Sequence, residues 1–151
     1  MIKPLDQKQI GISQKIYDIF QVSYAVEAAL LKCDNFPPLS RSVEAIKSTK
    51  SGFYGYFMHQ SIAAVIELEE KPDHVHVRSL TVDPEYFRQG IGFKLLQFVL
   101  DNFNAELITV ETGYDNHPAV QFYLNFGFKK NKVWMTEVGI EKISFTLLRK
   151  S

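Results

Sequence analysis

The segment 74–112 constrains the fold most, because its apolar residues change their period twice. His74–Val82 alternates in the manner of a strand, and Asp83-Pro84 ends that pattern. Gly90 then opens a helix with one apolar face, formed by Ile91, Leu95, Leu96, Val99 and Phe103. Leu107–Thr112 again has the character of a strand. Because a helical crossover joins parallel strands, we expect one parallel pair here.

The amino-terminal third predicts helices. Apolar residues recur at helical spacing over Gln14–Leu31, and Phe36-Pro37-Pro38 ends this region. Ser42–Ser48 predicts a second, short helix, with Ser40 as its N-cap.

Antiparallel hairpins are expected on either side of the crossover unit. Phe53–Met58 and Ser61–Glu69 are β-rich and are joined at His59-Gln60. Trp134–Val138 and Glu141–Leu148 predict a terminal hairpin that turns near Gly139. Between the crossover unit and this hairpin, Ala119, Phe122, Tyr123 and Phe126 stripe a helix that Gly127 closes. The fold class is therefore a mixed α/β (α+β) sheet in one domain, 1–151.

Composition narrows the functional classes. The chain is 46% hydrophobic, and its 17 basic residues balance 17 acidic ones, so it lacks the basic footprint of a nucleic-acid binder. Cys33 is the only cysteine, which rules out an internal disulfide or a Cys-rich zinc site. The first residues do not resemble a signal peptide, and no run approaches the ~20 apolar residues of a membrane span. We expect a cytoplasmic protein that requires no metal and binds neither nucleic acid nor a membrane, and a homodimer stays open.

The turn Arg88-Gln89-Gly90-Ile91-Gly92 has the features of an anion site. Unpaired N–H groups and the helix dipole favour negative charge at a helix N-terminus, and glycines let a phosphate approach the backbone. Tight packing is an equal explanation of two glycines in such a place. The dinucleotide pattern GxGxxG fails because Leu95 occupies its last position, and no Gly-Lys-Ser/Thr of a Walker motif follows.

Two longer segments give the glycine turn a more specific interpretation. Ser79-Leu80-Thr81-Val82-Asp83-Pro84-Glu85-Tyr86-Phe87-Arg88-Gln89-Gly90-Ile91-Gly92-Phe93-Lys94-Leu95-Leu96 resembles the acetyl-CoA-binding motif of the GNAT superfamily of N-acetyltransferases. Asn116-His117-Pro118-Ala119-Val120-Gln121-Phe122-Tyr123-Leu124-Asn125-Phe126-Gly127-Phe128 resembles the second motif of that superfamily. The resemblance covers residues 53–130 and implies a mostly antiparallel, twisted sheet with one splayed parallel strand pair and flanking helices.

The resemblance also implies a set of residues that bind acetyl-CoA. The set comprises the splayed strand, the glycine turn with the first helical residues after it, and two positions of the second motif: Leu80, Val82, Arg88, Gln89, Gly90, Ile91, Gly92, Phe93, Lys94, Asn116 and Phe122. Backbone N–H groups of Leu80 and Val82 would meet the thioester carbonyl. Phe87 departs from the motif, which usually has Gln or Arg there, and Arg88 and Gln89 could supply the polar contact instead.

Acyl transfer to an amine needs a base for the amine and benefits from an acid for the thiolate. The resemblance gives Tyr123 as the acid, and a core aromatic residue is the alternative reading of the same position. The base would fall on His76, on a strand face expected to be shared by His74, Arg78 and Leu80. Glu67 and Glu111, on neighbouring strands, are the other candidates for the base.

The implied function is acetyl-CoA-dependent acetylation of a primary amine on a small or amino-acid-like molecule. A lysine or amino terminus of a protein as acceptor, and a non-catalytic acyl-CoA-binding module, are the alternatives. The acceptor side would be formed by the amino-terminal helices and the terminal hairpin, with these wall residues: Tyr17, Phe20, Tyr24, Glu27, Phe36, Phe53, Tyr54 and Trp134.

Overall fold

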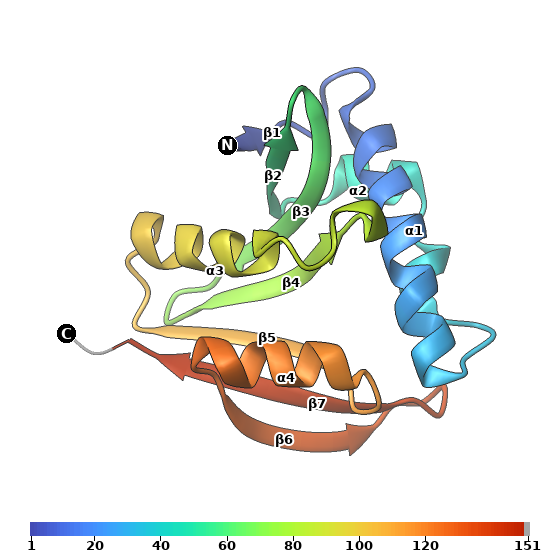
Figure 1. Ribbon diagram of the computed structural model, residues 1–151, viewed down its shortest axis with the longest axis vertical. Helices are drawn as coiled ribbons and strands as arrows, with labels where there is room; N and C mark the ends of the chain where they lie inside the picture. Colours follow the sequence, from blue (N-terminus) through green and yellow to red (C-terminus); the bar gives the residue numbers. More distant parts are fainter. Residues whose placement is uncertain (150–151) are drawn as a thin grey trace.

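A computed structural model describes residues 1–149 and contains one seven-stranded sheet with the order β1-β2-β3-β4-β5-β7-β6 (Figure 1). The strands are β1 (Ile2–Leu5), β2 (Gly52–Met58), β3 (Ser61–Glu70), β4 (Val75–Val82), β5 (Leu107–Gly113), β6 (Lys129–Met135) and β7 (Glu141–Leu148). The helices are α1 (Ile12–Leu31), α2 (Val43–Ser48), α3 (Ile91–Asn102) and α4 (His117–Phe126), with short 3₁₀ turns η1 (Pro37–Ser40) and η2 (Pro84–Tyr86). No helix in residues 1–149 combines the length and apolarity that crossing a membrane requires.

Each face of the sheet has its own core. The apolar stripes of α3 and α4 pack with Ile66 and Val77 of the sheet on one face. The stripe of α1 packs with Ile46 of α2 and with Phe53 and Val65 on the other face. The mixed α/β fold expected from the sequence is confirmed.

The expected parallel pair is β4 with β5, and it is short. Val75, His76 and Val77 pair with Ile108, Thr109 and Val110, after which the strands separate. Figure 1 shows them diverging toward α1, which stands beside their open end. The crossover helix α3 runs back over β4, as the change in apolar period predicted.

A bulge in β4 changes which face its side chains occupy. Glu67 of β3 pairs with Ser79, but Leu68 pairs with Val77, so Arg78 is an extra residue in β4. Val77 and Leu80 consequently both lie against the α3 core, although they are three positions apart in the sequence. The expectation that His76, Arg78 and Leu80 share one face is therefore wrong, because the extra residue reverses the alternation beyond it.

The remaining differences are at strand and helix ends. Ser42, rather than Ser40, caps α2, and its hydroxyl accepts from the Ala45 N–H at 3.0 Å. The strand predicted at Trp134–Val138 instead spans Lys129–Met135, an edge strand whose mostly exposed lysines hide its pattern. The predicted turn near Gly139 is confirmed by its positive φ of 82°. The short edge strand β1, which pairs with β2, was not expected from the sequence.

Candidate active site

A cavity of about 560 Å³ occupies the opening between β4 and β5. Leu80 and Val82 of β4 line it, Val110, Glu111 and Thr112 of β5 line the opposite side, and residues of α1 form a third wall. The cavity exists because parallel pairing stops at Val77, so the strand ends beyond that point leave space between them.

The amino termini of two helices point at this cavity. Gly90, the N-cap of α3, has a φ of 74°, and a Cβ there would meet nothing within 4 Å. Asn116 caps α4 by accepting from the Ala119 N–H at 3.3 Å, and both residues line the cavity. Two helix N-termini on one cavity make it favourable for an anionic group.

The β4 backbone also presents donors to the opening. The Asp83 N–H bonds to the Ala63 carbonyl of β3 at 2.8 Å. Because N–H groups alternate between the two edges of a strand, those of Leu80 and Val82 face away from β3, toward the space where β5 has separated. A carbonyl oxygen placed in that space would find backbone donors.

Tyr123 projects from α4 into the same cavity. Its ring packs between Phe122, Phe128 and Phe145 at centroid distances of 5.2, 5.5 and 5.6 Å, so its position is fixed by aromatic contacts. Burial, followed by the nearby Glu27 carboxylate, raises the pKa of Tyr123 above its ordinary value. The phenol therefore keeps its proton at neutral pH and is available as a donor.

A second cavity of about 400 Å³ adjoins the first. Its own walls come from Phe20 of α1, the loop with Phe36, Pro37 and Pro38, and the β6–β7 turn with Val138 and Ile140. The two cavities share Tyr24, Glu27, Arg78, Ser79, Glu111 and Thr112, so they meet at the divergence of β4 and β5.

The three candidate bases lie in different surroundings. Glu111 lines both cavities and accepts from Lys142 Nζ at 2.6 Å. His76 lines neither cavity, and its Nδ1 lies 2.7 Å from the Thr109 hydroxyl. Glu67 also lines neither and is fully buried, with Arg41 Nη1 at 2.7 Å and Nη2 at 2.8 Å from its oxygens.

The comparisons with known proteins identify the family. A protein-family model described as "Acetyltransferase (GNAT) family" matches residues 14–128, which is most of the chain. The chain belongs to the GNAT acetyltransferase family. Among its relatives, the UPF0157 protein YqkA of Bacillus subtilis (strain 168) is 36% identical over 131 residues, covering 86% of this chain. The chain spans only 38% of the length of that relative.

Solved structures show the same GNAT fold. The ribosomal-protein-S18-alanine N-acetyltransferase from Escherichia coli superposes with a TM-score of 0.75 at 21% identity, covering 98% of this chain and 92% of that one. A GNAT family acetyltransferase from Elizabethkingia anophelis, with acetyl-CoA bound, superposes with a TM-score of 0.73 at 16% identity, covering 99% and 97%.

The cavity contains most residues that the GNAT resemblance singled out. The two strand residues, the turn, the start of α3 and the second motif contribute these lining residues: Leu80, Val82, Arg88, Gly90, Ile91, Gly92, Phe93, Asn116, Phe122 and Tyr123. Gln89 and Lys94 are not among the lining residues, and Lys94 Nζ instead lies 3.4 Å from the Tyr56 hydroxyl. Among residues 1–149, no three His, Cys, Asp or Glu side chains gather closely enough to hold a metal ion.

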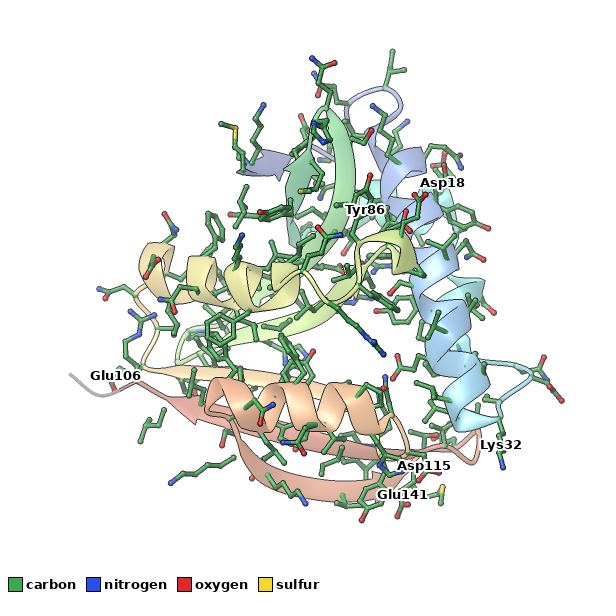
Figure 2. The ribbon with its side chains drawn as sticks, viewed as in Figure 1. Asp18, Lys32, Tyr86, Glu106, Asp115 and Glu141 are labelled. Atoms are coloured by element: carbon green, nitrogen blue, oxygen red, sulfur yellow. The ribbon has the colours of Figure 1, made fainter. Side chains whose placement is uncertain are left out.

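The α1 side of this cavity was only partly expected from the sequence, which pointed to Tyr24 and Glu27 but not to three further lining residues of α1. Ser23, Val26 and Leu30 line the larger cavity, and Tyr86 and Phe87 line it from the β4–α3 connection. Figure 2 shows Tyr86 at the end of that connection nearest α1. The helical spacing of α1 marks its buried stripe, but nothing in that spacing tells which of its other residues face a cavity.

Proposed function

We propose that the chain is an acetyl-CoA-dependent N-acetyltransferase that acetylates a primary amine of a small or amino-acid-like acceptor. One observation carries the proposal: two cavities with different walls meet where β4 and β5 separate. Such an arrangement suits a reaction in which two substrates exchange a group at the junction.

Acetyl-CoA would occupy the larger cavity. The features that support this are the two helix N-termini, for the pyrophosphate, and the backbone N–H groups of Leu80 and Val82, for the thioester carbonyl. The acetyl-CoA bound to the Elizabethkingia anophelis relative, which shares this fold, agrees with the assignment. Gln89 and Lys94 lie outside the lining, so we assign the polar side-chain contact to Arg88.

Proton transfer would use side chains at the junction. The acceptor amine loses a proton to a base and forms a bond to the acetyl carbon, and the C–S bond then breaks. We assign the base to Glu111 because it lines both cavities, whereas His76 and Glu67 line neither. Tyr123 would return a proton to the departing thiolate, for which its raised pKa keeps it protonated.

Tyr123→Phe and Glu111→Gln test the proposal. We measure thiol release from acetyl-CoA with a panel of small amines, amino acids and short peptides, because the E. coli structural relative is named for a ribosomal-protein acceptor. Wild type should release CoA with at least one amine. Tyr123→Phe should lower kcat about 10²-fold, which is within the rate effect expected of one general acid or base. Its acetyl-CoA affinity, measured by calorimetry, should stay within about twofold of wild type. Glu111→Gln should lose turnover in the same way.

Two results would count against these assignments. Wild-type binding of acetyl-CoA without turnover on any amine would support a non-catalytic acyl-CoA-binding module instead. Unchanged turnover in Tyr123→Phe or in Glu111→Gln would remove that residue from its role.

A further inference from the structure

Glu27 is the acidic side chain that α1 places at the junction of the two cavities. It lines both, and it is held by β5: Thr112 Oγ1 donates to Glu27 Oε2 at 2.8 Å, and the Gly113 N–H donates to the same oxygen at 3.2 Å. Both donors bind Oε2. Oε1 has no hydrogen-bond partner in the described part of the chain, so it can accept from a ligand.

The charge of Glu27 is also uncompensated. Glu111 is paired with Lys142 at 2.6 Å, and Glu67 with Arg41 at 2.7 Å. Among residues 1–149, no ion pair involves Glu27. Arg78, a basic residue that lines both cavities, lies 3.8 Å from Glu67 and 4.0 Å from Glu69 instead. A carboxylate without a cation, on the wall of a cavity, favours a cationic ligand.

The wall beside Glu27 is aromatic and apolar. Tyr24 lies between Phe20 and Phe36, at ring-centroid distances of 5.6 and 6.0 Å, and Val138 and Ile140 line the opposite turn. Such a wall suits an apolar or aromatic group attached to the cation, because burying it removes apolar surface from water.

We propose that Glu27 binds the ammonium group of the acceptor, and that the acceptor is a primary amine carrying a compact apolar or aromatic group. The proposal rests on the proposed acetyl transfer and adds the acceptor class to it. Glu27 holds the ammonium at the junction, within the cavity wall that it shares with Glu111, which takes the proton.

The test compares Glu27→Gln with wild type. Glutamine keeps a carbonyl oxygen for Thr112 and Gly113 but removes the charge, so the connection between α1 and β5 remains. Glu106→Gln is the matched control, because Glu106 is exposed and lies at the opposite end of β5 from Asp115 (Figure 2).

Phenethylamine and 2-phenylethanol serve as probes, since they share the aromatic group and differ in charge. Each is titrated calorimetrically into the protein with and without CoA. A peptide with an N-terminal phenylalanine is titrated in the same way, to compare binding of a peptide amino terminus with binding of a small amine. We expect wild type and Glu106→Gln to bind an amine at least tenfold more tightly than the alcohol. Glu27→Gln should lose that preference while its CoA affinity stays within twofold.

Several results would overturn the proposal. These are equal binding of amine and alcohol by wild type, no binding of either amine, or an amine affinity of Glu27→Gln within twofold of wild type. Failure of wild type to bind CoA would instead refute the proposed function, and the titrations without CoA would still test Glu27. If Glu27→Gln fails to fold in a thermal melt, Glu27→Asp replaces it and must weaken amine binding without weakening alcohol binding.

Discussion

The buried carboxylate of Glu67 gives the sharpest prediction about stability. It has 0% exposure and accepts from both Nη atoms of Arg41 at 2.7 and 2.8 Å, and from the Ser79 hydroxyl at 2.8 Å. Glu67→Gln keeps the shape but leaves the Arg41 guanidinium without its counter-charge. Breaking one side of a buried ion pair costs about 3–5 kcal/mol, so we expect the free energy of unfolding to fall by about that amount.

Chemical and thermal unfolding measure this loss. For a chain of this length, each kcal/mol shifts Tm by about 2–4 °C, so Tm should fall by roughly 10 °C. Glu69→Gln on the same strand is the control, because Glu69 is partly exposed and lies 4.0 Å from Arg78. An exposed pair of this kind contributes at most about 1 kcal/mol.

The pH dependence gives a second test of Glu67. Burial alone would raise its pKa, but the hydrogen bonds and charge of Arg41, with the Ser79 hydroxyl, hold the pKa below its usual value. A carboxyl with a lowered pKa in the folded state stabilises fully above its unfolded pKa of about 4.3, and this contribution disappears as the pH falls through the folded pKa. The difference between wild type and Glu67→Gln should therefore shrink in acid. A loss below about 1 kcal/mol at pH 7 would refute the structural reasoning, and lost turnover at unchanged stability would restore Glu67 as the base.

Two further substitutions test the sheet and the glycine turn. A Cβ at Gly92 would lie 3.0 Å from Phe122 Cζ, so Gly92→Ala should push this ring into the cavity. Acetyl-CoA binding measured by calorimetry should weaken by about 1 kcal/mol, roughly fivefold. Unchanged affinity would show that the ring moves freely. Burial, more than any neighbouring charge, lowers the pKa of His76 in the folded chain. As the pH drops below about 6.5, the unfolded chain therefore takes up a proton at His76 more readily than the folded chain, and stability should fall. His76→Gln should lose less stability between pH 7 and 5 in urea titrations, and an identical loss would discard this explanation.

The parts of the site that the sequence predicted are local in the chain. Gly90, Gly92 and Asn116 were found because a strand, a turn and a helix start follow one another within a few residues. Lys94 was expected beside them, yet it lies about one helical turn further along α3 than Ile91, and its Nζ is 3.4 Å from the Tyr56 hydroxyl of β2.

The parts that the sequence analysis missed depend on distant contacts or on irregular backbone. Glu27 meets Thr112 across 85 residues of chain, and no periodicity encodes such a contact. The bulge at Arg78 leaves only a weak sign in the sequence, the adjacent polar residues Arg78 and Ser79 that interrupt the alternation of β4. A simple alternation carried through them assigned Leu80 to the wrong face. His76, which the resemblance offered as a base, lies away from the cavities because it pairs with Thr109 in the part of β4 that has not yet separated from β5.

The bulge and two carboxylates, the buried Glu67 and the half-buried Glu27, together account for the position of the site. Beyond Arg78, Ser79 turns to the α1 face and donates to Glu67, which also fixes Arg41 and the loop before α2. Across the opening, Glu27 connects α1 to Thr112 of β5. The strands are thus attached to the same amino-terminal helical layer at the point where their own pairing has ended, through Glu67 on the β4 side and Glu27 on the β5 side. The opening can therefore remain wide without backbone hydrogen bonds across it. Breaking the Glu67 connection should loosen the second cavity, whereas Glu27→Gln, which retains its hydrogen bonds, should change its ligand preference alone.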